Sequence, residues 1–209
     1  MATLLYCVVE LQAPRVEMPA GVGGAGVQAT EFDGLRALHS EAESAALSAT
    51  IRERAGEFHR VVAAIFAEVA TISFRFPTLF ASGQEMTEHL QPKAAAMAAF
   101  LRQRRDQVEM EIRIAPPSVH ESQSGAEYLR RRAEQARELE RAGEAIRARA
   151  AVLDWKQYAL AGGLRCYALL RRSDVRSWRT AVAEANLPAG VRAVVSGPWP
   201  ANEFLDLDK

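Results

Sequence analysis

Net charge and cysteine are both scarce in this sequence, and each shortage excludes a class of protein. The 26 basic residues are balanced by 26 acidic ones among 209 residues, so no bulk charge draws the chain to nucleic acid or to an anionic membrane. The two cysteines, Cys7 and Cys166, lie in apolar runs and form no Cys-x-x-Cys pair. This usage predicts two buried thiols in a reducing, cytoplasmic compartment rather than a disulfide framework.

Long hydrophobic runs are missing as well. The longest apolar stretch, residues 61–74, contains Glu68 and is shorter than the roughly 20 residues that cross a bilayer. The first residues carry no basic segment and reach Glu10 too early for a signal peptide. With 49% hydrophobic and 25% charged residues, the composition predicts a soluble globular protein rather than a disordered chain.

Catalytic and ligand-binding motifs are also missing. The four histidines have no metal-ligand spacing, and the sequence contains no G-x-S-x-G elbow, Walker loop or H-E-x-x-H helix. Gly21, Gly23 and Gly26 match G-x-G-x-x-G, but a dinucleotide site needs a strand directly before the first glycine and a helix at the third. Here a loop precedes the glycines and an extended segment follows them, so we expect a flexible loop. We therefore predict a non-enzymatic protein with no catalytic residue, metal or cofactor.

The first half of the chain alternates between strand and helix patterns. Apolar and β-branched runs predict strands, and apolar residues spaced three and four apart predict helices. The expected strands are 3–10, 27–32, 34–40, 72–76 and 107–114, and the expected helices are 43–70 and 84–105. This order predicts a ferredoxin-like α+β domain over residues 1–114, with helices on one face of an antiparallel-rich sheet.

The second half begins after a segment at 115–125 that has the proline-containing, polar composition of a linker. The expected elements are a long helix at 126–152, a hairpin at 154–160 and 165–171, a short helix at 175–182 and a strand at 191–195. They predict a C-terminal domain over residues 126–209 that combines a long helix with a small ferredoxin-like α+β layer and ends in a tail. Pairing of its last strand is expected to stop by Gly197, because the prolines that follow cannot donate ladder hydrogen bonds.

Four segments resemble the gas vesicle protein F/L family, in the family's order and across almost the whole chain. An opening strand, an extended segment around an Arg-Phe pair, a Tyr-Leu start of the long helix and a Gly-Pro-Trp-Pro motif carry the resemblance. They are LLYCVVEL at 4–11, TISFRFPTLFAS at 71–82, GAEYLRRR at 125–132 and VVSGPWPANEF at 194–204. The chain departs from the family pattern at Pro77, where glycine is usual, and at 201–203, where Ala-Asn-Glu replaces Pro-Tyr-Ser.

The resemblance implies a minor accessory protein that is required for gas vesicle assembly. It implies contact with the small apolar shell protein and with other gas vesicle accessory proteins, and a location in the cytoplasm and at the gas vesicle. Together with the charge balance, it implies no enzyme activity, small-molecule substrate, nucleic acid or lipid membrane as partner. An assembly factor needs surfaces that hold an aggregation-prone apolar subunit, and sheet edges and apolar patches supply them.

The expected partner interface follows the segments that carry the resemblance. Arg75 is expected to point away from Phe74 and Phe76, which we expect to fill the core. The ring of Trp199 is fixed by two prolines, and it packs either on a partner or on the protein's own tail through Phe204. The predicted contact residues are Arg75, Pro77, Thr78, Phe80, Tyr128, Arg130, Trp199, Pro200 and Phe204.

Two other functions remain open. A regulatory ligand-binding module would hold a small effector at the glycine run 21–26 or in the cleft between the domains. An RNA-binding protein would use the arginine clusters at 102–105 and 130–132. Glutamates interleave the second cluster, and this pattern is typical of a solvated, ion-paired helix.

Overall fold

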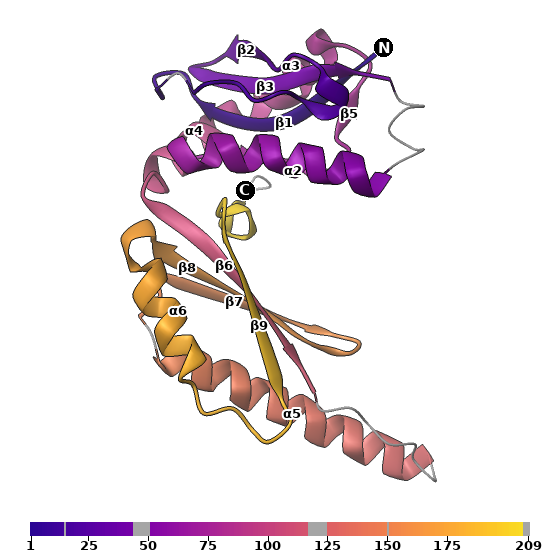
Figure 1. The fold of residues 1–209 in the computed structure, drawn as a ribbon, viewed down its shortest axis with the longest axis vertical. Coiled ribbons are helices and arrows are strands. Elements are labelled where there is room, and N and C mark those ends of the chain that lie inside the picture. Colours follow the sequence, from indigo (N-terminus) through magenta and orange to yellow (C-terminus); the bar gives the residue numbers. More distant parts are fainter. Residues whose placement is uncertain (15, 44–50, 117–124, 150, 207–209) are drawn as a thin grey trace. The chain divides into compact units, whose positions relative to one another are not determined.

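The computed structural model describes residues 1–14, 16–43, 51–116, 125–149 and 151–206. Within these ranges the chain forms two compact units (Figure 1). The first unit is built from Met1–Asp106 together with Pro200–Lys209, and the second from Gln107–Trp199. Each unit contains an antiparallel sheet and helices, which confirms the predicted α+β class.

The first unit contains a five-stranded sheet in which the strands are ordered β2-β3-β1-β4, with β5 also paired to β1. Its strands are β1 (Ala2–Glu10), β2 (Gln28–Phe32), β3 (Leu35–Ala42), β4 (Ile72–Ser73) and β5 (Leu79–Phe80). Its helices are α2 (Ile51–Glu68), α3 (Gly83–Leu90) and α4 (Ala94–Gln103), with short 3-10 turns η1 (Val22–Gly24), η2 (Gln91–Lys93) and η4 (Asn202–Phe204). All strand pairs are antiparallel.

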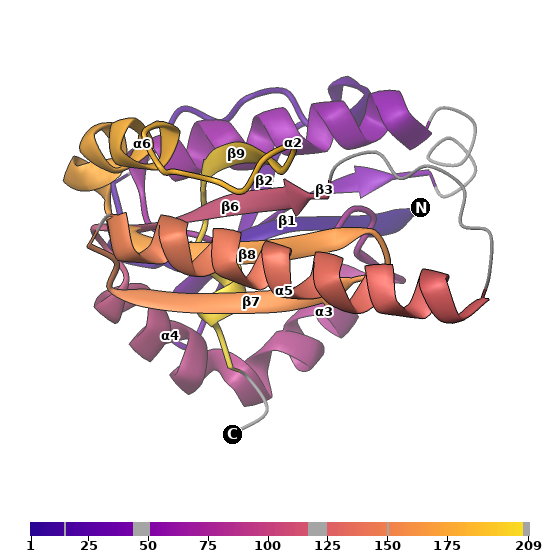
Figure 2. The same ribbon diagram turned by 90° about the horizontal axis from the view of Figure 1, so that it is seen from below.

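Strand β1 lies inside this sheet, and both of its faces are buried. On one face Leu4, Tyr6 and Val9 pack with Phe58 and Ile65 of α2. The side chains between them are equally buried, and Figure 2 shows α2 and the α3–α4 pair on opposite sides of β1–β3. The sheet therefore differs from the prediction that helices cover one face. The continuous apolar run of β1 is the sequence signal for cover on both faces.

Two further elements of the first unit differ from the sequence-based expectation. The helix expected at 84–105 is divided into α3 and α4 at η2, because Pro92 has no backbone N–H to donate to the preceding turn. The strand expected at 72–76 pairs only over Ile72–Ser73. The helix expected at 43–70 is α2, and residues 44–50 lie outside the described residues.

The second unit is a βαββαβ fold. Its elements are β6 (Gln107–Ala115), α5 (Gly125–Arg149), β7 (Asp154–Leu160), β8 (Gly163–Arg171), η3 (Arg172–Asp174), α6 (Val175–Ala183) and β9 (Arg192–Trp199). The strand order is β7-β8-β6-β9, and every pair is antiparallel. A split βαβ motif repeated in this order is the ferredoxin-like arrangement.

Strand β6 belongs to the second sheet, whereas we expected it to complete the first. Its residues pair with β8 on one side and with β9 on the other, so it is an inner strand of the ferredoxin-like unit. The division between the compact units therefore falls at residue 106 rather than in the predicted linker. Most of that linker, residues 117–124, lies outside the described residues. The alternating pattern of β6 predicted a strand correctly but carried no information about which sheet it joins.

Helix α5 packs on the second sheet through its C-terminal half. Leu139, Ala142, Gly143 and Ile146 are buried, and a Cβ atom at Gly143 would lie 3.1 Å from a methyl group of Leu164 on β8. The small residue thus allows the helix to approach the strand closely. Within the described ranges, none of the helices combines the length and the hydropathy that a bilayer crossing requires.

Candidate functional site

The chain leaves α2 through a very short strand that lies at the edge of the first sheet. Ser73 of β4 pairs with Cys7, and Ile72 pairs with Val8. The N–H of Phe74 donates to the carbonyl of Tyr6 over 3.0 Å. Backbone groups alternate in direction along an antiparallel strand, so the N–H and C=O of Ser73 point away from β1.

The outward backbone groups of Ser73 are bound by a side chain from the C-terminal tail. The N–H of Ser73 donates to Oδ1 of Asn202 over 3.2 Å. In return, Nδ2 of Asn202 donates to the Ser73 carbonyl and, over 2.9 Å, to its Oγ. An amide side chain has the same donor and acceptor as a peptide group. Asn202 therefore occupies the position that a neighbouring strand would take at Ser73.

An open pocket of about 600 Å³ lies beside this contact. It is lined by Ile72, Ser73, Phe74, Arg75, Thr78, Asn202, Glu203 and Leu205. The side chain of Arg75 is exposed, and its guanidinium makes no hydrogen bond or ion pair with the described residues. The loop that carries it is held by Thr78, whose hydroxyl donates to the Arg75 carbonyl over 2.6 Å. The pocket thus has a mixed lining, in which Phe74 and Leu205 are apolar, Arg75 is a cation and Glu203 supplies a carboxylate.

The other predicted residues of this segment lie around the pocket in different ways. Phe76 packs into the core, as expected, with its ring 5.4 Å from that of Phe58. Phe74 instead is half-buried and lines the pocket. Pro77 lies in the loop between Phe76 and β5 and is exposed. Phe80 is half-buried on β5, with its ring 5.4 Å from the imidazole of His89.

The Gly-Pro-Trp-Pro motif is divided between the two compact units. Trp199 ends β9, where it pairs with Glu109 and its Nε1 donates to Oγ of Ser196 over 3.3 Å. The expectation that pairing stops by Gly197 is therefore wrong. The strand passes Pro198 by a register shift, and pairing resumes at Trp199. Pro200 and Phe204 are buried and belong to the first unit.

The predicted contacts on α5 do not line this pocket. Tyr128 is exposed in the first turns of the helix, and its hydroxyl accepts a hydrogen bond from Arg132 over 3.0 Å. Arg130 donates to the carbonyl of Ala126 over 3.4 Å. Glu127 forms an ion pair with Arg131 at 2.6 Å, in line with a solvated, ion-paired helix surface.

The pocket also contains residues that were not predicted from the sequence, namely Ser73, Asn202, Glu203 and Leu205. Asn202 stood out only as a departure from the family pattern. Asparagine side chains often bind nearby backbone groups in turns, which is a general signal for such a role. No sequence rule, however, indicates that its partner lies 129 residues away.

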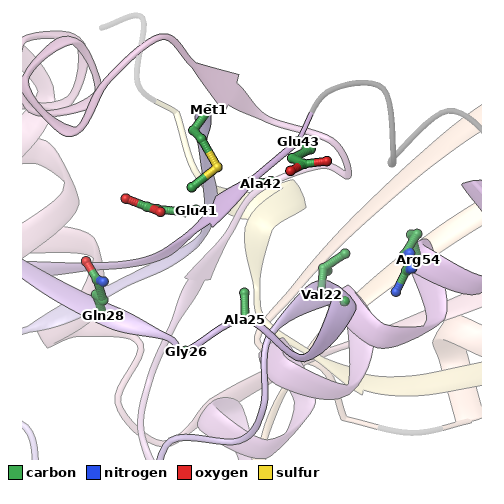
Figure 3. A pocket seen from close by; sticks show the side chains of 10 residues that line it. Met1, Val22, Ala25, Gly26, Gln28, Glu41, Ala42, Glu43 and Arg54 are labelled. Atoms are coloured by element: carbon green, nitrogen blue, oxygen red, sulfur yellow. The ribbon is translucent and has the colours of Figure 1, made fainter.

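The glycine run 21–26 lines a second pocket of about 470 Å³ together with Arg54 and residues of β3 (Figure 3). The loop is attached to the rest of the unit at two points, which the sequence did not indicate. The N–H of Val22 donates to the Tyr6 hydroxyl, and the N–H of Gly23 donates to the Glu57 carboxylate, both over 2.8 Å. Hydrogen bonds from Gly23 and then from Arg54 hold the pKa of Glu57 below its usual range.

This second pocket is poorly suited to a phosphate. The backbone N–H that a phosphate would use is bound by a carboxylate, which also repels anions. The two thiols offer no alternative chemistry: burial raises the pKa of Cys7, and burial followed by the charge of Glu144 raises that of Cys166 to about 12. Among the described residues, no group of three or more His, Cys, Asp or Glu side chains is placed to hold a metal ion.

Comparison with known proteins identifies the family. The sequence profile described as gas vesicle synthesis protein GvpL/GvpF matches residues 2–161. The chain belongs to this family. The matched range contains Arg75 and Thr78 of the first pocket, and the tail with Asn202 lies beyond it. No curated protein matches the sequence.

Solved structures of two gas vesicle proteins share the fold. GvpF from Microcystis aeruginosa aligns with a TM-score of 0.79 and 12% identity, over 98% of this chain and 99% of that one. GvpF from Anabaena sp. PCC7120 aligns with a TM-score of 0.75 and 13% identity, over 98% and 96% of the two chains. At such identities the likeness shows the fold alone, and it confirms that both sheets and their order along the chain are those of the family.

Proposed function

We propose that this protein is a non-enzymatic accessory factor of gas vesicle assembly that binds the small apolar shell protein. Membership of the gas vesicle synthesis family gives the process. The proposed contact is the pocket beside β4, together with the exposed Arg75. The observation that carries this choice is the combination, at a sheet edge, of half-buried apolar side chains, Phe74 and Leu205, and a guanidinium without a partner among the described residues.

The physical properties of this edge fit a protein partner better than a small substrate. The pocket is open, and its walls come from one strand, one loop and the tail. Arginine beside apolar side chains is enriched at the centres of protein interfaces. A sheet edge offers backbone groups that bind an extended chain of almost any sequence. We infer that the protein works in the cytoplasm and at the growing gas vesicle, with other accessory proteins as further partners.

Replacement of Arg75 tests the proposed contact. Arg75→Ala should reduce capture of purified shell protein by about tenfold or more, since a charged contact at an interface centre is worth about 1.4 kcal/mol or more. Because the side chain is exposed, the free energy of unfolding, measured by urea denaturation, should change by no more than about 0.5 kcal/mol, as is usual for a surface substitution. Capture is measured with immobilised protein and soluble shell-protein fusion.

Arg102 provides a matched control. It is an exposed arginine of the same unit, on α4, and does not line the pocket. Arg102→Ala should leave capture unchanged. Full capture by Arg75→Ala, or equal losses in the two variants, would exclude the pocket as the contact.

A further inference from the structure

The outer edge of the first sheet is covered at Ser73 by the C-terminal tail. Ser73 belongs to the two-residue strand β4, and its backbone N–H and C=O point away from β1. Asn202 binds both groups of Ser73. The Arg75 carbonyl accepts the hydroxyl of Thr78 from within its own loop. At Ser73 an incoming extended strand could therefore make the backbone hydrogen bonds that Asn202 now makes with its side chain.

The tail covers this edge without forming a strand. It turns through η4, at Asn202–Phe204, and it is fastened by buried side chains at Ala201 and Phe204. Across the edge itself, the described link is a single side-chain amide with three hydrogen bonds. Such a link costs little to open, because each net hydrogen bond is weak in water.

We propose that the C-terminal tail, residues 200–206, is a displaceable cover of β4, and that an extended strand of the shell protein replaces Asn202 at Ser73. This inference rests on the proposed function, and it adds how the partner is bound and what competes with it. Addition of a strand to an open sheet edge is a general mode of peptide recognition. In this mode, main-chain hydrogen bonds supply affinity and alternate side chains supply specificity.

The side chains around the edge define the chemistry of the incoming strand. Arg75 is exposed and lacks a partner among the described residues, so the strand should carry a carboxylate at the position facing it. Phe74 is half-buried and lines the same pocket, so a flanking side chain of the strand should be apolar. The occupant is therefore an extended, apolar segment with an acidic residue.

A removable covalent link between tail and edge tests the exchange. The double variant Ser73→Cys with Asn202→Cys places thiols on two side chains that are now in contact through Oγ and Nδ2, 2.9 Å apart. A short bis-methanethiosulfonate reagent joins them, and a reductant separates them again. The native thiols, Cys7 and Cys166, are buried, so they should not react. Each single-cysteine variant, treated with the same reagent, serves as a control.

The unlinked double variant should capture shell-protein fusion roughly tenfold more tightly than the parent protein, because three competing hydrogen bonds are gone and the open state is more populated. The linked form should lose capture, and reductant should restore it. Equal capture by the linked and unlinked forms would overturn the displaceable cover while leaving the proposed function intact. Failure of every form, including the parent protein, to capture the shell protein would instead refute the proposed function.

The charge preference is tested separately with short peptides. Two β-forming peptides that differ only in a central Glu or Lys are titrated into the unlinked variant. The Glu peptide should bind more tightly by about tenfold, and Arg75→Ala should remove the difference. Equal binding of the two peptides would contradict the assignment of an acidic strand.

Discussion

The two sheets of this protein have the same strand order but very different edges. In each unit the first strand, β1 or β6, lies beside the third, and the second and fourth strands lie on the outside. The fourth strand of the second unit, β9, has eight residues. In the first unit the corresponding side of β1 is paired by β4 and β5, which have two residues each and are separated by a loop. One architecture thus yields a long, complete edge in one unit and an incomplete edge in the other.

The connection between the first and second strands differs as well. In the second unit this connection contains α5, whose buried side chains lie on the sheet. In the first unit it is a loop with one short turn, η1, and α2 covers that face through Phe58 and Ile65. The same order of strands can therefore be covered by different elements, provided that the inner strand is buried. The unit with less regular structure at its edge also carries the candidate binding site.

The largest effect on stability should come from the bulge that lets β9 continue past its proline. Gly197 has a φ of 113°, and a Cβ atom there would lie 2.9 Å from the Glu109 carbonyl and 3.1 Å from the Met110 sulfur. We expect Gly197→Ala to cost about 3 kcal/mol, because backbone strain and a steric clash add together. Thermal unfolding followed by circular dichroism measures the loss.

Gly162→Ala is the matched control for this change. An added Cβ at Gly162 would meet no atom within 4 Å, so the cost should stay below about 0.5 kcal/mol. If both variants are equally stable, the long fourth strand of the second unit does not depend on the bulge.

A smaller loss of stability should follow when the loop between β1 and β2 loses its hydrogen bond to Tyr6. The Tyr6 hydroxyl accepts from the N–H of Val22 and bonds Oγ of Ser40, both over 2.8 Å in a buried site. Tyr6→Phe leaves those two groups unsatisfied, which should cost about 1–3 kcal/mol. Urea denaturation measures the change. Tyr158→Phe, at an exposed tyrosine of β7, should have almost no effect, and an equal loss there would refute the role of the hydroxyl.

The smallest effect concerns pH and is confined to the first unit. Burial lowers the pKa of His39 on β3 from its ordinary 6.5, and its Nε2 lies 2.8 Å from the Thr30 hydroxyl. The folded state therefore binds the proton less readily than the unfolded state does. The contribution of His39 is complete above pH 6.5 and is lost as the pH falls below it.

Urea midpoints at pH 8, 6 and 5 should decline less for His39→Gln than for the parent protein. The amide of glutamine can still bond the Thr30 hydroxyl but does not titrate. Identical declines would show that other groups control the response.

The sequence predicted where the strands lie better than it predicted which strands pair with one another. The alternation in β6 and the apolar run of β1 each identified a strand, because burial on a sheet leaves a period of two or a continuous run. The sheet to which β6 belongs depends on pairing with β8 and β9, which are distant in sequence. The predicted unit boundary failed for the same reason.

The site was predicted in part. Arg75 and Thr78 were proposed from the segment around Phe74, and both line the pocket. Ser73 and Asn202 were missed, since their contact joins two segments that no local pattern connects. Trp199 and Phe204 were both predicted as interface residues, but they belong to different compact units. Local periodicity contains no information about where a chain passes from one unit to another.

The most direct test compares the two fourth-strand edges in one experiment. A photo-crosslinking phenylalanine derivative replaces Phe74, which lines the pocket beside β4, or Val194, an exposed residue of β9. After illumination with shell-protein fusion, the variant at 74 should form a crosslinked product of the summed mass, and the variant at 194 should not. Crosslinking from 194 without crosslinking from 74 would contradict the incomplete edge of the first unit as the binding site.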